Sequence, residues 1–208
     1  MTLLSNHYYS EKPNVASDEQ QHEWQLRGFK LKFTTDAGVF SKAGVDYGSQ
    51  VLIGAMEFAE HATVLDVGCG YGPIGITAAK LAPKGHVTMI DINERAVQLS
   101  KRNAALNDVH NVTVMQSDLY EAVKEMRFDC IISNPPIRAG KAVVHRVFEE
   151  GYELLNDGGT MWIVIQKKQG APSAKAKLES MFAGVEEVTK DKGYRIFKAT
   201  KGSSKIQL

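Results

Sequence analysis

From residue 63 to residue 166, the chain alternates between short apolar segments and longer segments with helical periodicity. The apolar segments have the length and composition of buried strands, and they span residues 63–68, 86–92, 112–118, 128–134 and 158–166. The segments between them predict helices at residues 73–82, 94–107 and 141–155, with a short helix from residue 119. Parallel strands joined by helices form a sheet that is covered on both faces. The alternation therefore predicts a Rossmann-like, doubly wound α/β fold.

The C-terminal part of the chain departs from this alternation. A helix is predicted near residues 173–183, and two strand-like segments then flank Lys192 and Gly193. A Lys-Gly pair between two strands favours a tight hairpin turn, so these strands are expected to pair antiparallel. The hairpin brings the predicted sheet to seven strands, mostly parallel, with an antiparallel C-terminal hairpin strand.

The N-terminal part starts as a polar stretch and then carries one or two extended segments between residues 24 and 41. A helix predicted over residues 45–61 leads into the first strand of the alternating region. We therefore predict two parts in this chain. An N-terminal extension, residues 1–45, covers the substrate face of a domain that spans residues 46–208.

The composition narrows the class of protein. The 208 residues are 43% hydrophobic. Because 25 Lys and Arg balance 24 Asp and Glu, the net charge by itself does not point to a nucleic-acid partner. No apolar run approaches the ~20 residues that span a bilayer, which predicts a soluble, cytoplasmic protein. Cys69, Cys130 and the six histidines lack the spacing of metal ligands, so no metal site is expected. The G-x-S-x-G turn of α/β-hydrolases is also missing.

The first predicted strand runs into the glycine-rich stretch LDVGCGYGPIG, which also opens the first helix of the alternating region. Such a loop gathers backbone amides and lets a nucleotide approach closely. One interpretation is the G-x-G-x-x-G of dinucleotide-binding oxidoreductases, with Gly70, Gly72 and Gly75 as its glycines. The other places an acid, Asp66, in the strand before Gly68 and shares the next two glycines. That acid suits the ammonium group of a nucleotide that carries an amino acid.

Two further acids end the next two strands. Asp91 ends the second strand, where its carboxylate can accept hydrogen bonds from both hydroxyls of a ribose. Asp118 ends the third strand, where it can accept from an adenine amine while Leu119 covers the ring. Either acid could instead cap the helix that follows it. Binding is the favoured interpretation for Asp91, and both interpretations stay open for Asp118.

The fourth strand ends in Asn134-Pro135-Pro136-Ile137, at the same edge of the sheet. Each proline biases the residue before it toward extended geometry and removes an N–H donor. The side-chain oxygen of Asn134 and the carbonyl of Pro135 are then free to accept both hydrogens of a planar amine. Such acceptors turn the nitrogen lone pair toward an electrophile, which suits methylation of an exocyclic amine. A proline-stiffened loop without a chemical role is the alternative.

Together these stretches resemble a known family. LDVGCGYGPIG, DIN, QSDLY and NPPIRAGK, preceded by FTTDAGVFSKAGVDYGS, resemble class I S-adenosylmethionine-dependent methyltransferases of the small-domain group. Within that group, residues 25–200 are most similar to the 16S ribosomal RNA guanine-N2 methyltransferases. The resemblance implies the class I methyltransferase fold, S-adenosyl-L-methionine as the cofactor, and N2 of a guanine in 16S rRNA as the methylated amine.

The resemblance also implies a role for each candidate residue. For the methionine end of the cofactor it implies Asp66, Gly68 and Gly70, with Gly72 in the same loop. For the ribose and adenine it implies Asp91 and Ile92, and for the adenine also Asp118 and Leu119. Asn134 would lie beside the cofactor, and Phe40 and Ser41 would close over it. Around the target amine it implies Asn134, Pro135, Pro136 and Ile137. For Phe40, a simple packing role is the alternative. Ile137 is a departure, because many amine methyltransferases of the broad group have an aromatic ring there that stacks on a flipped base.

RNA is the partner that the resemblance implies. The chain has basic residues near Asn134 and Pro135, the acceptor clamp for the target amine, and these can bind RNA phosphates. They are Arg138, Lys141, Arg146, Lys167, Lys168, Lys175 and Lys177. Three alternatives remain open from the residues. They are a protein glutamine-amide N-methyltransferase, a dinucleotide-dependent oxidoreductase, and a non-catalytic RNA-binding relative that kept the fold.

Overall fold

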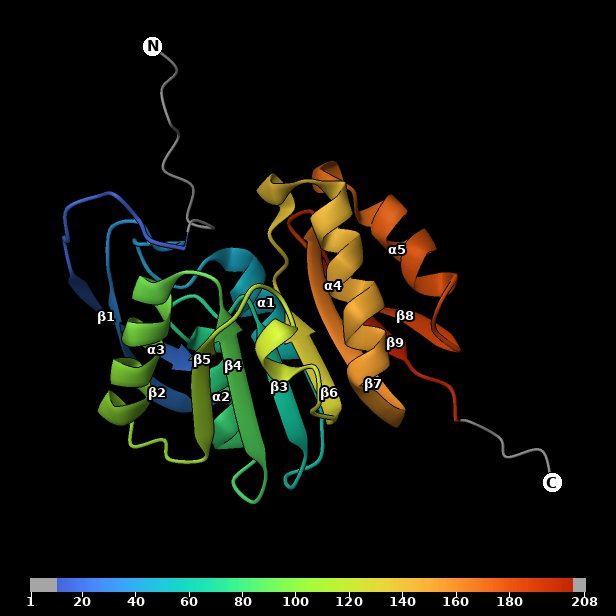
Figure 1. The fold of residues 1–208 in the computed structure, drawn as a ribbon, viewed down its shortest axis with the longest axis horizontal. Coiled ribbons are helices and arrows are strands. Elements are labelled where there is room, and N and C mark those ends of the chain that lie inside the picture. The colour runs from blue at the N-terminus through green and yellow to red at the C-terminus, as the bar shows by residue number, and fades with distance from the viewer. Residues whose placement is uncertain (1–10, 204–208) are drawn as a thin grey trace, which may run out of the picture.

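A computed structural model describes residues 11–203, and its centre is a seven-stranded sheet (Figure 1). The strands follow the order β5-β4-β3-β6-β7-β9-β8. They are β3 (Thr63–Val67), β4 (His86–Asp91), β5 (Val112–Gln116), β6 (Phe128–Ser133), β7 (Leu155–Gln166), β8 (Gly184–Asp191) and β9 (Tyr194–Thr200). Strand β9 pairs antiparallel with both β7 and β8, and the other pairs are parallel. The predicted fold class, including the antiparallel C-terminal hairpin, is confirmed.

Helices cover both faces of this sheet (Figure 1). One face packs against α1 (Tyr47–Ala55), α2 (Pro73–Leu81) and α3 (Glu94–Leu106), and the other against α4 (Lys141–Leu154) and α5 (Ala171–Glu179). Three short 3-10 turns, η1 (Glu121–Val123), η2 (Ile137–Ala139) and η3 (Lys167–Gln169), lie between elements. Successive residues of a strand point to opposite faces, so Val64 belongs to one core and Leu65 to the other. Strands buried on both faces explain why the sequence shows continuous apolar runs.

The extended segments upstream form an antiparallel hairpin of β1 (Gln20–Leu26) and β2 (Phe29–Thr35). Leu31 and Phe33 of β2 are buried in the same core as Val64. Asn103 of α3 fastens the hairpin, because its Oδ1 accepts from Thr34 N (2.8 Å) and its Nδ2 donates to Thr34 O (2.9 Å). The predicted division after residue 45 stays a prediction, and residues 1–10 and 204–208 of its two parts lie outside the described residues.

The helix before β3 is shorter than the predicted residues 45–61. Asp46 is its N-cap, because the Asp46 side chain accepts from Ser49 N. The helix ends at Ala55, where Arg27 Nη1 donates to Ile53 O (3.0 Å) and Met56 O (2.7 Å). A side chain from the β1–β2 turn thus satisfies carbonyls that a longer helix would have used itself.

The site described below lies where the chain order of the strands reverses. Strand β3 has β4 on one side and β6 on the other, so the chain winds outward in both directions from this pair. Ligands of open α/β sheets bind at such switch points, beyond the carboxyl ends of the strands. Among residues 11–203, no helix is long and apolar enough to cross a membrane. The same residues contain no group of three or more His, Cys, Asp or Glu arranged to hold a metal ion.

Candidate active site

A cavity of about 280 Å³ lies at this switch point, and it is lined by the segments that follow β3, β4, β5 and β6. The predicted site residues that line it are Phe40, Ser41, Gly68, Gly70, Asp91, Ile92, Asp118, Leu119, Asn134, Pro135 and Pro136. Three predicted residues, Asp66, Gly72 and Ile137, do not line it. The topology thus brings segments from four strand ends to one space.

The glycine-rich loop forms the floor between β3 and α2. Gly68 N and Cys69 N donate to Ile90 O (2.9 and 3.0 Å), and Gly70 N donates to Asp91 Oδ2 (2.8 Å). Gly68 and Gly70 have φ of 74° and 57°, a region that favours glycine. A Cβ at either position would meet no protein atom within 4 Å. Glycine is therefore selected there by backbone conformation, and it leaves open space above the loop.

Gly72 and Asp66 support this loop from below. Gly72 is the N-cap of α2 at φ 103°, and Pro73 begins the helix as predicted. Asp66 is fully buried, and its Oδ2 accepts from Gly75 N (2.8 Å). Its Oδ1 has no hydrogen-bond partner among residues 11–203. Burial raises the pKa of Asp66 to about 7, and the charge of Asp91 adds to the rise. The acid organises the start of α2, and a contact with the cofactor stays a proposal.

Asp91 connects the glycine-rich loop to the segment after β4. Its second oxygen, Oδ1, accepts from Asn93 N (2.9 Å). Burial raises the pKa of Asp91 to about 6, although the backbone hydrogen bonds from Asn93, Gly70 and Ile92 oppose the rise. The N-cap of α3 is Asn93, whose Oδ1 accepts from Arg95 N (2.9 Å). Asp91 is therefore not the helix cap that the alternative interpretation required.

The same holds for Asp118 after β5. The N-cap of η1 is Tyr120, without a side-chain capping bond, and the nearby hydrogen bond from Ala122 N goes to Ser117 Oγ (3.0 Å), not to Asp118. Asp118 is exposed and lines the cavity. Leu119 also lines the cavity and has φ of 46°, a conformation that is unfavourable for a leucine. Backbone strain of this kind gathers at ligand sites, which agrees with Leu119 facing the cavity.

The Asn-Pro-Pro stretch differs from the sequence expectation in one respect, because the carbonyl of Pro135 already accepts a hydrogen bond. Asn134 Nδ2 donates to Ser49 Oγ (3.0 Å) and Asp46 Oδ2 (3.3 Å), both at the start of α1. Pro136 has φ −75° and ψ 79°, which closes an inverse γ-turn from Ile137 N to Pro135 O (2.9 Å). The carbonyl of Pro135 is therefore not free, although an oxygen with two lone pairs can accept a second hydrogen bond.

Ile137 lies away from the cavity. Its side chain packs against the core cluster on the α4 face of the sheet, beside residues such as Val144. The resemblance to the methyltransferases implied that Ile137 lies around the target amine, because it follows the two prolines. The inverse γ-turn and the η2 turn after it direct the chain toward α4 instead.

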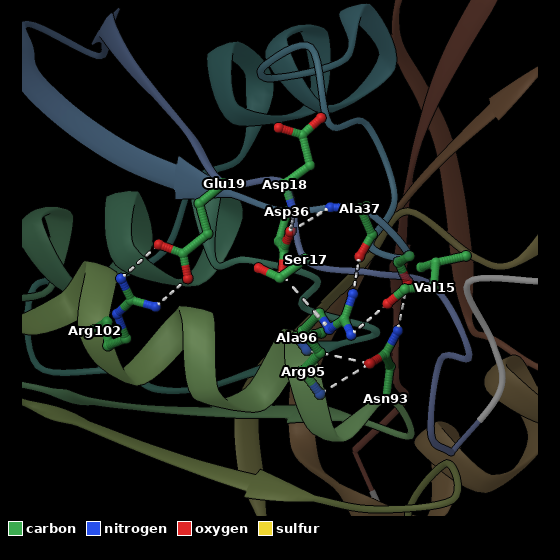
Figure 2. Close-up of polar contacts among 11 residues, drawn as sticks. Val15, Ser17, Asp18, Glu19, Asp36, Ala37, Asn93, Arg95, Ala96 and Arg102 are labelled. Atoms are coloured by element: carbon green, nitrogen blue, oxygen red, sulfur yellow. Dashed lines mark hydrogen bonds and ion pairs between the residues drawn. The ribbon is translucent and has the colours of Figure 1, made fainter.

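Phe40 and Ser41 line the cavity. The residues just before them in the same loop are held by Arg95 of α3 and by its N-cap Asn93, as the contact at Ala37 in Figure 2 shows. Arg95 donates to Ala37 O (2.6 Å) and Val15 O (2.9 Å), and Asn93 Nδ2 donates to Gly38 O (2.8 Å).

Beside these bonds, Asp36 is buried and accepts from Ser17 Oγ (2.9 Å), Asp18 N and Ala37 N. Burial alone raises the pKa of Asp36, but these hydrogen bonds and the charge of Arg95 hold it below its ordinary value. Residues 15–18 and 36–38 therefore form one hydrogen-bonded unit with the start of α3.

Sequence reasoning missed several cavity residues, among them Asp46, Ser49, Tyr71 and Asn93. An Asp three residues before Ser49 is a capping pattern that the sequence offers at the start of α1. No sequence signal places that cap beside Asn134. The Tyr71 hydroxyl, like Asp66 Oδ1, is buried without a hydrogen-bond partner among residues 11–203. Buried polar atoms of this kind are rare, and they fit a ligand with donors and acceptors of its own.

The residues present fit an amino-acid-bearing nucleotide such as S-adenosyl-L-methionine. The loop leaves open space, the carboxylate of Asp91 lies at the end of β4, and the cavity is also lined by Tyr71, whose hydroxyl has no hydrogen-bond partner among residues 11–203. Residues 30–198 match the family described as methyltransferase small domain. The match covers most of the chain, so the protein belongs to this family and is a methyltransferase. The predicted family and its cofactor, S-adenosyl-L-methionine, are confirmed.

Individual relatives refine the comparison. The chain is 53% identical over 200 residues to the uncharacterized protein YbxB of Bacillus subtilis, covering 95% of this chain and 100% of that protein. It is 31% identical over 193 residues to ribosomal RNA small subunit methyltransferase C of an Escherichia coli strain, covering 91% of this chain and 54% of that protein. It is 32% identical over 200 residues to ribosomal RNA large subunit methyltransferase G of Pseudomonas putida, covering 93% of this chain and 52% of that protein. The chain thus spans about half the length of these two methyltransferases.

A solved structure gives the same picture. The fold is similar to a Thermus thermophilus 16S rRNA N2 G1207 methyltransferase in complex with AdoMet and guanosine, with a TM-score of 0.79 and 25% identity. The alignment covers 91% of this chain and 52% of that chain. A ribosomal protein L11 methylase of Lactobacillus delbrueckii has a TM-score of 0.61 and 21% identity, which shows a shared fold alone.

Proposed function

We propose that this methyltransferase acts on RNA and transfers the methyl group to an exocyclic base amine, N2 of a guanine in small-subunit ribosomal RNA. The observation that carries the proposal is the position of Asn134-Pro135-Pro136 on the cavity that the glycine-rich loop also lines. Acceptors for an amine and a site for the cofactor are thereby within one space. The T. thermophilus neighbour, a 16S rRNA N2 G1207 methyltransferase in complex with AdoMet and guanosine, supports the choice of amine.

The chemistry follows from the poor nucleophilicity of such an amine, whose lone pair is delocalised into the base. S-adenosyl-L-methionine supplies an electrophilic methyl group when it is bound. Asn134 Oδ1 accepts one amine hydrogen, and the second lone pair of Pro135 O accepts the other. These two acceptors favour a pyramidal nitrogen and direct its lone pair, which stabilises the transition state more than the ground state. As the N–CH₃ bond forms and the S–CH₃ bond breaks, the nitrogen would become acidic and release one hydrogen as a proton to water, so no strong base is needed for this step.

The first experiment is methylation of unmodified small-subunit RNA, free and as particles, with S-adenosyl-[methyl-³H]methionine. The labelled nucleoside is then identified by digestion and chromatography. We expect label in N2-methylguanosine. Label in another nucleoside would contradict the choice of amine, and label only in added release-factor protein would identify a glutamine amide as the acceptor.

Asn134→Ala tests the clamp within this experiment. We expect it to keep S-adenosyl-L-methionine binding and to lose turnover by roughly 100-fold, the loss typical of one removed transition-state contact. Asn156→Ala is the matched control, because Asn156 binds Asp129 outside the cavity. Equal turnover of Asn134→Ala and the wild type would rule out the clamp.

The predicted basic residues divide into two groups in the structure. Arg146, Lys175 and Lys177 form ion pairs with Glu150, Glu179 and Glu149. The others, Arg138, Lys141, Lys167 and Lys168, are exposed and form no ion pair within residues 11–203. We therefore assign the RNA phosphates to this second group, at the ends of β6 and β7.

A salt titration tests the assignment. Lys167→Ala/Lys168→Ala should weaken RNA binding and lower the slope of log K against log salt by about 1 to 2, as expected for two lost phosphate contacts. The control pair is Lys175→Ala/Lys177→Ala, whose charges are already balanced by carboxylates. Equal slopes for the two double variants would contradict the assignment.

A further inference from the structure

The orientation of the Asn134 amide is set by residues outside the Asn-Pro-Pro stretch. A carboxylate only accepts hydrogen bonds, so the Asn134 group that faces Asp46 Oδ2 is the NH₂. Ser49 Oγ receives the same NH₂ at 3.0 Å. The amide is planar, so when its nitrogen is held on the α1 side, its oxygen points away from α1. No hydrogen bond to that oxygen occurs within residues 11–203.

The first turn of α1 is a rigid support for this contact. Asp46 Oδ2 also accepts from Ser49 N (3.1 Å), so one oxygen holds both the helix start and the amide. Ser49 is 4% exposed. A Cβ at Gly48 would lie 2.7 Å from the ring of Tyr194, so the turn packs tightly on the first residue of β9. Arg27 holds the other end of the helix.

From this geometry we infer that Asp46 and Ser49 are positioning residues, which hold the Asn134 amide with its oxygen available to the target amine. The inference rests on the function proposed above. Without these two partners the amide is free to rotate by half a turn, and it then presents NH₂ donors to an amine that needs acceptors. The role of Asp46 and Ser49 is therefore to select one of two nearly isosteric orientations of Asn134.

Three variants separate this role from helix capping. Ser49→Ala removes one partner of Asn134 and leaves the Asp46 cap in place. Asp46→Ser keeps a good N-cap residue but is too short to reach Asn134. Asp46→Asn keeps an oxygen that can cap the helix and accept from Asn134.

The expected results are a fall in kcat of about tenfold for Ser49→Ala, and of about 10- to 100-fold for Asp46→Ser, because the lost partner is charged. Asp46→Asn should recover most of the activity. The Kd for S-adenosyl-L-methionine and the melting temperature should change little in all three. Unchanged kcat in Ser49→Ala and Asp46→Ser, with Asn134→Ala inactive, would overturn the positioning role and leave the proposed clamp intact.

A second measurement does not depend on turnover. In a ¹⁵N-labelled protein, the side-chain NH₂ of Asn134 is the pair of signals that Asn134→Ala removes. Hydrogen exchange of this pair should be slow in the wild type and at least about tenfold faster in Ser49→Ala and Asp46→Ser. The Asn156 pair, bound to Asp129, serves as the internal control. Equal exchange of the Asn134 NH₂ in all proteins would refute the positioning role, whether or not RNA is methylated. Failure to methylate RNA would count only against the proposed function.

Discussion

Replacing Asp66 with asparagine should stabilise the protein at alkaline pH but not at acid pH. The carboxyl group is fully buried, and burial raises its pKa from 3.8 to about 7. Between these two values the unfolded chain loses the proton while the folded protein keeps it. Stability therefore falls as the pH rises through this window and is constant above it. A difference of this size corresponds to roughly 4 kcal/mol at pH 8.

Asparagine removes the titration and keeps an oxygen for Gly75 N, but it buries an NH₂ group without an acceptor at about 1–3 kcal/mol. At pH 5, the two effects nearly cancel. From pH 5 to pH 8, the stability of Asp66→Asn relative to the wild type should rise by about 3 kcal/mol. The charge of Asp91, whose own pKa is raised to about 6, contributes to the rise at Asp66, so Asp66→Asn also removes this repulsion.

The assay is urea unfolding at a series of pH values, followed by tryptophan fluorescence. Asp108→Asn is the control for the same substitution at the surface, where the side chain is 89% exposed. A stability difference between Asp66→Asn and the wild type that stays constant with pH would refute the reasoning. A difference that shrinks as the pH rises would show that its sign is wrong.

Three further variants test other contacts. Asn103→Ala leaves backbone groups of Thr34 and Tyr71 without their buried partner, and urea unfolding should show that the free energy of unfolding falls by about 2–4 kcal/mol. A fall of less than about 1 kcal/mol would contradict this. Gly75→Ala places a Cβ 2.6 Å from Met89 Cγ, so it should cost about 1–3 kcal/mol, and this cost should be smaller when it is measured in a Met89→Ala background; an equal cost in both backgrounds would point to another cause. Asp91→Asn should raise the Kd for S-adenosyl-L-methionine by about tenfold or more in calorimetry; an unchanged Kd would remove Asp91 from the cofactor site.

The elements of the sheet were predictable because each depends on local signals. Apolar runs identify strands that are buried on both faces, and the Gly72-Pro73 pair marks the start of α2. Lys192 and Gly193 both have positive φ, as a tight hairpin turn between two strands requires. The common location of Asp91, Asp118 and Asn134 also followed from sequence, because the carboxyl ends of parallel strands meet at one edge.

The contacts within the site were not predictable in the same way. Asp46 and Asn134 are 88 residues apart, and no local pattern indicates that a helix cap and a loop amide share one oxygen. The inverse γ-turn at Pro136 occupies the Pro135 carbonyl and turns Ile137 into the core. Both effects depend on backbone angles after the prolines, which residue identities restrict but do not determine.

The electrostatics of the site explain why the glycine-rich loop suits one of its two possible ligand types. Asp66 is fully buried and Asp91 is half-buried, both have raised pKa values, and neither forms an ion pair within residues 11–203. A pyrophosphate placed over this loop would lie near the carboxylate of Asp91 and above the buried Asp66, and Arg146, a cation that lines the cavity, is already paired with Glu150. A ligand with an ammonium and a sulfonium group would instead favour their ionised forms and be bound more tightly by them. We therefore propose that the acid before the glycines, rather than the spacing of the glycines, distinguishes a methyl-donor site from a dinucleotide site in this chain.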